Sequence, residues 1–162
     1  MTEKTYEYRI PNDSMKIPVV ARGRWFEHPQ MMNIELTTKC PLRCPQCYCD
    51  LETGKDIDRD IAIKWLNNAA SCGIKIVCLS GGETMCYPHL TELIRECKRL
   101  GLESNIALSG ALVTREKLLE LIDAGVTGIY VSLNGSTAEI NNKSRDGFDL
   151  AIKTLELLKD IG

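Results

Sequence analysis

Residues 74–83 read Ile-Lys-Ile-Val-Cys-Leu-Ser-Gly-Gly-Glu, an apolar run that only Lys75 interrupts before it ends in Ser80-Gly81-Gly82. Continuous apolar runs of this length are typical of strands that are buried on both faces of a parallel sheet. The stretch therefore predicts a buried parallel strand over 74–80, and the two glycines allow the chain to turn at its carboxyl end.

The same unit of strand, helix and glycine repeats on both sides of this run. Further strands are predicted over 32–37, 102–109 and 126–133, and helices over 58–72, 88–100, 114–124 and 149–161. Gly73, Gly101 and Gly125 stand where the first three helices are expected to end. Alternating strands and helices imply right-handed crossovers, so the predicted fold class is α/β with a parallel sheet of about four strand–helix units.

Apolar faces are expected on the first two helices. The predicted set on the first helix is Ile61, Trp65, Ala69 and Cys72, and on the second Leu90, Leu93, Ile94, Cys97 and Leu100. Cys72 and Cys97 are therefore interpreted as small hydrophobic side chains rather than as ligands.

Length and composition set the class of protein. The chain has 162 residues, 44% of them hydrophobic and 26% charged, with a formal net charge of −2. The length predicts one main domain, and the start of the repeating units places it over 31–162. Residues 1–30 form an N-terminal extension, which Trp25 and Phe26 are expected to pack onto the domain. The weak negative charge argues against nucleic-acid binding, and no apolar stretch is long enough to span a membrane.

Eight cysteines occur in a chain that opens on a polar segment rather than on an apolar signal sequence. We therefore expect a cytoplasmic, reducing setting. In such a setting, clustered cysteines indicate metal ligands before disulfides.

Three of the predicted strands end in a small polar residue followed by glycine. These pairs are Ser80-Gly81, Ser109-Gly110 and Asn134-Gly135, while the first strand runs directly into a cysteine loop. Ligands of parallel α/β sheets bind outside the carboxyl ends of the strands. Although a single glycine there only turns the chain, four unusual loops on one edge predict a binding site.

The cysteine loop carries Cys40, Cys44 and Cys47 in the spacing C-x3-C-x2-C. Three thiolates on a four-iron cluster leave one iron with an open position, where a small molecule can bind. Zinc with Cys49 as a fourth ligand is the alternative, although a single residue between Cys47 and Cys49 is an awkward spacing for one tetrahedron. Purely structural thiols are the third interpretation.

This cysteine loop after a first strand, with Gly81-Gly82-Glu83 after the second, resembles the radical S-adenosylmethionine (radical SAM) enzymes over about residues 31–162. The resemblance implies a partial TIM barrel of parallel strand–helix units. It also implies a [4Fe–4S] cluster on Cys40, Cys44 and Cys47 that binds SAM at the fourth iron. Such enzymes cleave SAM reductively to methionine and a 5′-deoxyadenosyl radical, and the cofactors carry that chemistry.

The resemblance also assigns the SAM contacts. Gly81, Gly82 and Glu83 match the motif that receives the SAM ammonium, and Ser109 stands where many relatives have Asn-Gly. At the end of the fourth strand, the resemblance assigns Ser132 and Asn134 to SAM binding. It also assigns Arg145, whose guanidinium would pair with the SAM carboxylate. For Arg145 an ordinary solvated charge is the competing interpretation, and for Ser132 it is a polar end to a buried strand.

Two departures from the family pattern stand out. Gln46 precedes the third cysteine where an adenine-shielding aromatic is usual, and the aromatic residue comes later as Tyr48. Both residues are expected to contact the cofactor, Gln46 through its backbone. The usual domain has about six strand–helix units, so this chain is expected to be truncated after the fourth, or to have its remaining strands supplied by another segment.

The loop and the Val-Ser-Leu-Asn-Gly strand end most resemble SPASM-type enzymes that modify ribosomally made peptides. The expected partners are a peptide substrate and a reductant such as flavodoxin or ferredoxin. A radical SAM enzyme acting on a small molecule or tRNA, and a non-enzymatic zinc- or cluster-binding module, are the alternatives. No residue is identified as a catalytic acid or base, because the radical itself abstracts hydrogen.

Overall fold

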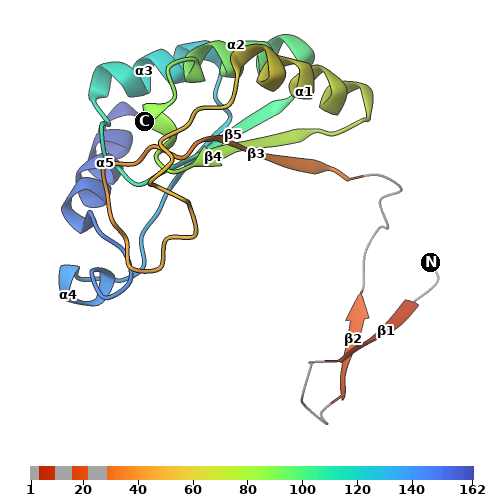
Figure 1. Ribbon diagram of the computed structural model, residues 1–162, viewed down its shortest axis with the longest axis horizontal. Coiled ribbons are helices and arrows are strands. Elements are labelled where there is room, and N and C mark those ends of the chain that lie inside the picture. Colours follow the sequence, from red (N-terminus) through yellow and green to blue (C-terminus); the bar gives the residue numbers. More distant parts are fainter. Residues whose placement is uncertain (1–3, 10–15, 22–28) are drawn as a thin grey trace.

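Four parallel strands in the order β3-β4-β5-β6 form one sheet, and helices cover one of its faces (Figure 1). The structure is a computed structural model that describes residues 4–9, 16–21 and 29–162. The strands are β3 (Met31–Thr37), β4 (Ile76–Gly81), β5 (Glu103–Leu108) and β6 (Gly128–Val131). The helices are α1 (Arg59–Ser71), the 3-10 turn η1 (Thr84–Cys86), α2 (Leu90–Leu100), α3 (Arg115–Ala124), α4 (Ala138–Asn141) and α5 (Phe148–Ile161). Every strand and helix predicted for the domain is present, so the α/β class is confirmed.

Each strand pairs with the next one along the chain. In one row across the sheet, Asn33 lies opposite Cys78, Cys78 opposite Asn105, and Asn105 opposite Gly128. Since all four strands are parallel and adjacent in chain order, their carboxyl ends lie at the same edge of the sheet. The loops with the predicted site residues all leave from that edge.

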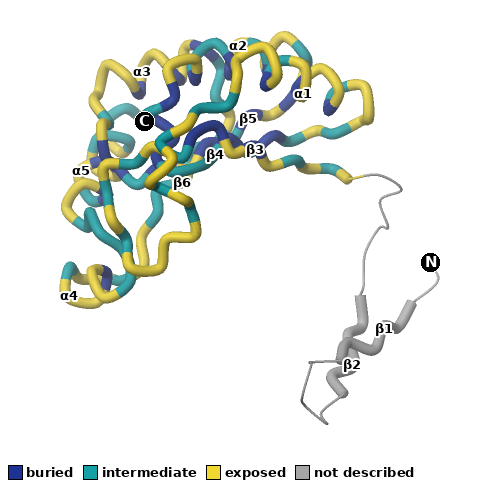
Figure 2. The backbone as a smooth tube through the Cα atoms, in the orientation of Figure 1, coloured by how far each residue is buried: buried dark blue, intermediate teal, exposed yellow. Residues whose placement is uncertain are grey.

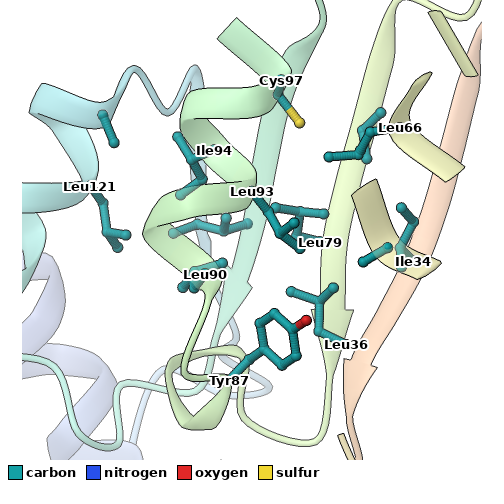
Figure 3. Close-up of a cluster of buried hydrophobic side chains, with 14 of the residues drawn as sticks. Ile34, Leu36, Leu66, Leu79, Tyr87, Leu90, Leu93, Ile94, Cys97 and Leu121 are labelled. Atoms are coloured by element: carbon teal, nitrogen blue, oxygen red, sulfur yellow. The ribbon is translucent and has the colours of Figure 1, made fainter. Parts of the chain in front are cut away.

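The core lies between the sheet and the helices (Figures 2 and 3). Alternate residues of the strands point to the helices and are buried, among them Ile34, Leu36, Leu79 and Ile106. From the other side, α2 contributes the apolar residues Leu90, Leu93, Ile94 and Cys97, all buried, which confirms the face predicted for this helix. Figure 3 shows Leu93 of α2 pointing at Leu79 of β4.

The predicted face of α1 is correct at Ala69 and wrong at Ile61 and Trp65. The helix buries Ala62, Leu66 and Ala69, whereas Ile61 and Trp65 stay about half exposed. The sequence carries two neighbouring apolar stripes here, and the stripe with two alanines lets the helix approach the sheet closely. The expected burial of Cys72 is also wrong, because this residue caps the end of α1 and is exposed.

A segment after the cysteine loop returns along the outer edge of β3, which the sequence did not indicate. The Ile57 amide donates to the Leu36 carbonyl at 2.8 Å, and the Thr38 amide donates to the Lys55 carbonyl at 2.8 Å. The Thr37 hydroxyl donates to the Asp56 carboxylate at 2.7 Å. The free edge of β3 is therefore partly paired near the cysteine loop, which protects it from pairing with another chain.

At the N-terminus, β1 (Lys4–Arg9) and β2 (Lys16–Ala21) form an antiparallel pair with Lys4 opposite Ala21. The predicted extension over 1–30 includes this pair, and the division of the chain at residue 30 stays a prediction. Trp25 and Phe26 lie outside the described residues. In the part of the chain that is described, no helix combines the length and apolar character needed to cross a membrane.

Replacing Leu93 by alanine tests the packing of α2 on the sheet. Leu93 has no exposed surface, so the Leu93→Ala variant is expected to lose about 2–5 kcal/mol in free energy of unfolding, measured by urea denaturation. Leu119→Ala on α3 is the matched control, since Leu119 is 45% exposed and its loss is expected to stay near 0.5 kcal/mol or below. Equal losses in the two variants would contradict the packing described.

Candidate functional site

The three cysteines lie on the loop that directly follows β3. Cys40 and Cys44 are half-buried, and Cys47 is exposed. The Cys47 amide donates to the Cys44 carbonyl at 3.0 Å, which closes a turn. The Arg43 guanidinium donates to the carbonyls of Cys40 and Leu42, each at 2.8 Å. The loop is therefore folded back on itself between its first and third cysteine.

The thiols of this loop influence one another electrostatically. Burial raises the pKa of the Cys40 thiol, a hydrogen bond from the Leu42 backbone opposes this, and the charges of Glu83, Cys44 and Cys47 raise the pKa further. Binding to a metal centre would remove the repulsion, because a coordinating thiol is deprotonated by the positive charge of the metal. Metal binding and thiol ionisation at this loop therefore favour each other.

The donor set fits an iron–sulfur cluster. Among the residues that the structure describes, no three Cys, His, Asp or Glu side chains converge on one point as the ligands of a single ion do. A four-iron cluster does not require such convergence, because each thiolate binds a different iron of a bulky group. Three separate soft thiols on one accessible loop match that requirement.

The turn after β4 lies against the backbone of the cysteine loop. The Gly82 amide donates to the Thr37 carbonyl at 2.7 Å, and the Glu83 amide donates to the Lys39 carbonyl at 2.8 Å. A Cβ atom at Gly81 would collide with the Thr37 carbonyl oxygen, and one at Gly82 with that of Lys39. Gly81 also has a φ of 136°, which other residues rarely adopt. Both glycines are therefore required by this close backbone approach.

Glu83 is a buried carboxylate that joins the loops after β4 and β5. It is 1% exposed and accepts hydrogen bonds from the Met85 amide at 3.1 Å and the Ser109 amide at 2.9 Å. The Ser109 hydroxyl also donates to it. Burial raises the pKa of Glu83, while these hydrogen bonds from Ser109 and Met85 act in the opposite direction. The structure thus uses both Glu83 and Ser109 inside the protein, where the resemblance assigned Glu83 to the SAM ammonium.

The end of β6 brings Asn134 and Arg145 together. The Arg145 Nε donates to the Asn134 side-chain oxygen at 3.2 Å, and the Asn134 side-chain nitrogen donates to the Ser144 hydroxyl at 2.9 Å. Ser132 continues the strand, and its amide donates to the Leu108 carbonyl at 2.8 Å. The two predicted residues Asn134 and Arg145 therefore form one hydrogen-bonded unit.

The segment that carries Arg145 also contacts the cysteine loop (Figure 1). The Gln46 amide donates to the Ser144 carbonyl at 3.3 Å, and the Arg43 amide donates to the Asp146 carboxylate at 2.9 Å. The Gln46 amide is therefore used within the protein, and the contacts of Gln46 and Tyr48 with the cofactor stay predictions. Tyr48 is 75% exposed.

Sequence reasoning missed two residues of this arrangement. Asn141 is fully buried and binds the backbone of Asn134 and Arg145, and Asp146 accepts from Arg43. The acidic residue directly after Arg145 was visible in the sequence, but nothing local indicated its partner. Cys49 is half-buried beside Cys47, whose thiol lies 4.0 Å from the Cys49 carbonyl oxygen.

The fold and the loops at its edge are those of one large family. The radical SAM superfamily pattern matches residues 34–162, so the chain belongs to this superfamily. Its members use a [4Fe–4S] cluster and S-adenosylmethionine.

Two curated relatives share one name. The PqqA peptide cyclase of Rhodopseudomonas palustris is 36% identical over 121 residues, which cover 73% of this chain and 32% of that protein. The PqqA peptide cyclase of Bradyrhizobium diazoefficiens is 34% identical over 142 residues, which cover 82% of this chain and 37% of that protein. The chain thus spans about a third of the length of these relatives.

Solved structures share the fold. Streptococcus suis SuiB bound to the precursor peptide SuiA matches with a TM-score of 0.73 at 20% identity, over 83% of this chain and 31% of SuiB. The enzyme anSMEcpe with bound AdoMet and the Cp18Cys peptide matches with a TM-score of 0.65 at 16% identity, over 82% of this chain and 40% of anSMEcpe. These matches confirm the partial barrel of parallel strand–helix units.

The buried Glu83 predicts a pH dependence of stability. Its pKa in the folded protein lies above the ordinary 4.5, so the folded protein retains a proton that the unfolded chain releases as the pH rises. The stability that this residue contributes is therefore complete below about pH 4.5 and declines as the pH rises through the raised pKa. Urea unfolding over this pH range is expected to show the decline in the wild type and not in a Glu83→Gln variant.

The same variant has a direct effect on stability. A glutamine places an NH2 group against the donors of Met85 or Ser109, so Glu83→Gln is expected to lose about 1–3 kcal/mol where the wild type is most stable. Glu120→Gln on the exposed side of α3 is the control, with an expected change within about 0.5 kcal/mol. A stability difference between wild type and Glu83→Gln that does not vary with pH would show that the Glu83 pKa is not raised.

Proposed function

We propose that this chain is the cluster-binding part of a radical SAM enzyme that modifies a ribosomally synthesised peptide. Cys40, Cys44 and Cys47 would hold a [4Fe–4S] cluster, and SAM would bind beside it at the carboxyl edge of the sheet. The observation that carries the proposal is the start of the three-thiol loop held directly against Gly82 and Glu83 by backbone hydrogen bonds. Membership of the radical SAM superfamily supports it.

Each residue of the edge has a physical task in this proposal. When bound and reduced, the cluster supplies the electron that splits SAM into methionine and a 5′-deoxyadenosyl radical. Arg145 is suited to the SAM carboxylate because its guanidinium can bind both oxygens, and the hydrogen bond to Asn134 orients it. Gly81 and Gly82 allow the turn after β4 to lie directly against the start of the cysteine loop.

Glu83 acts in this proposal through position rather than by direct contact. Its carboxylate is buried and held by Ser109 and Met85, so it fixes the turn whose backbone would face the SAM ammonium. A negative charge on Glu83 would also attract that ammonium electrostatically. Ser132, at the end of β6, is proposed to contribute a hydroxyl to SAM.

A peptide is proposed as the substrate because of the relatives. Two curated relatives are PqqA peptide cyclases, and SuiB and anSMEcpe are matched in complexes with peptides. The electron is proposed to come from a reductant such as flavodoxin or ferredoxin. The eight cysteines are all free thiols, which supports a reducing, cytoplasmic setting.

Single cysteine variants separate the cluster from the zinc alternative. After anaerobic reconstitution, Cys40→Ala, Cys44→Ala and Cys47→Ala are each expected to lose the brown absorbance and most of the bound iron and sulfide. Cys49→Ala is expected to keep them, because this residue is a neighbour rather than a ligand. Cys72→Ala, an exposed cysteine on the helical side, is the control for general effects of removing a thiol.

The zinc alternative makes the opposite prediction for Cys49. Stoichiometric zinc without iron, lost in Cys49→Ala as well as in the other three variants, would contradict the cluster.

With SAM and dithionite, the whole protein is expected to release 5′-deoxyadenosine and to change the mass of a short peptide encoded beside its gene. Turnover of a small molecule or tRNA instead, with the peptide unchanged, would replace the proposed substrate class.

A further inference from the structure

The cysteine loop is fastened to a segment that lies about a hundred residues later in the chain. The Arg43 amide donates to the Asp146 carboxylate at 2.9 Å across a separation of 103 residues. The Gln46 amide donates to the Ser144 carbonyl at 3.3 Å. Of these two contacts, the one to Asp146 is made by a charged acceptor, which forms the stronger type of hydrogen bond.

The position of Arg43 makes this contact important for the loop. Arg43 lies between Cys40 and Cys44, and its guanidinium already binds the Cys40 carbonyl. Pro41 and Pro45 remove two backbone donors from the same loop. The start of the loop is fixed through Lys39, and the Arg43 amide fixes the stretch between the first two cysteines to the segment after β6.

The segment that carries Arg145 and Asp146 is itself held by hydrogen bonds. Asn141 has no exposed surface, accepts from the Asn134 amide at 2.8 Å and donates to the Arg145 carbonyl at 2.7 Å. The Arg145 amide donates back to the Asn141 carbonyl at 2.9 Å. A buried, fully bonded polar network of this kind fixes one backbone conformation. Asp146, the next residue, therefore presents its carboxylate from a rigid base.

Arg145 and Asp146 are adjacent in the chain but bind different partners. Arg145 binds Asn134 through its Nε and is the proposed partner of the SAM carboxylate, whereas Asp146 binds the cysteine loop. Because one short backbone segment carries both residues, order at one of them restricts motion at the other. Two binding events that order the same segment stabilise each other by an equal amount.

We propose that Asp146 is a positioning residue that clasps the cysteine loop to the Arg145 segment, so that SAM binding and retention of the cluster reinforce each other. The clasp is a property of the protein alone, whereas the coupling rests on the proposed function. Asp146 does not contact the cluster or the substrate in this proposal. It acts through the Arg43 amide.

Amide hydrogen exchange measured by NMR tests the clasp in the cluster-free chain. Asp146→Ala removes the acceptor, so exchange at the Arg43 amide is expected to become about tenfold faster than in the wild type. Asp146→Asn keeps a side-chain oxygen that can accept, and is expected to restore most of the protection. Asp149→Ala, an exposed acidic residue in the first turn of α5, is the matched control and is expected to leave Arg43 unchanged. Unchanged exchange in Asp146→Ala would overturn the clasp.

Iron release to a chelator tests the coupling in the cluster-loaded chain. SAM bound at the fourth iron protects the cluster directly in both proteins, so the contribution of Asp146 is the difference: saturating SAM is expected to slow release by about tenfold in the wild type and by only about threefold in Asp146→Ala. Asp146→Asn is expected to resemble the wild type. Equal protection by SAM in wild type and Asp146→Ala would overturn the coupling. An Arg145→Ala variant that binds SAM as the wild type does would refute the role of Arg145 and with it the coupling. A wild type that assembles no cluster would refute the proposed function, and in both cases amide exchange would still decide the clasp.

Discussion

The backbone contact between the end of β3 and the turn after β4 determines what can be built at this edge of the sheet. The Gly82 amide reaches the Thr37 carbonyl at 2.7 Å, and no side chain fits at Gly81 or Gly82. The contact places the start of the cysteine loop directly beside the second strand end. Because Glu83 then links the same turn to Ser109 after β5, three neighbouring loops behave as one body. The segment after β6 joins them through Asp146.

This arrangement has an electrostatic consequence for the free protein. Glu83 and the neighbouring cysteines raise the pKa of the Cys40 thiol in addition to the effect of burial, so the loop opposes its own ionisation. A buried carboxylate is tolerated only because three donors surround it. A positively charged cofactor would relieve both effects at once, since it favours thiolates and a negative Glu83. The free loop is thus suited to binding a cationic group rather than to remaining without one.

The strands, the helices and the edge on which the site lies were predictable from the sequence, because apolar periodicity and strand-end glycines are local signals. The face of α1 was not, since Trp65 and Leu66 belong to two apolar stripes of similar strength, and only packing against the sheet selects one. The partners of Glu83 and Asp146 were also hidden. Glu83 binds Ser109, 26 residues away, and Asp146 binds Arg43, 103 residues away, and neither pairing leaves a local trace. The contacts that hold the site together are therefore those that the tertiary structure alone reveals.

The central claim is that three cysteines hold a four-iron cluster with one iron open to SAM. Mössbauer spectroscopy of the chain reconstituted with 57Fe tests this most directly, because it distinguishes the coordination of individual irons. The account predicts a [4Fe–4S] spectrum in which one iron of the four changes its signal when SAM is added, while the three thiolate-bound irons do not. A cluster whose four irons all remain unchanged with SAM, or a chain that binds no iron, would contradict it.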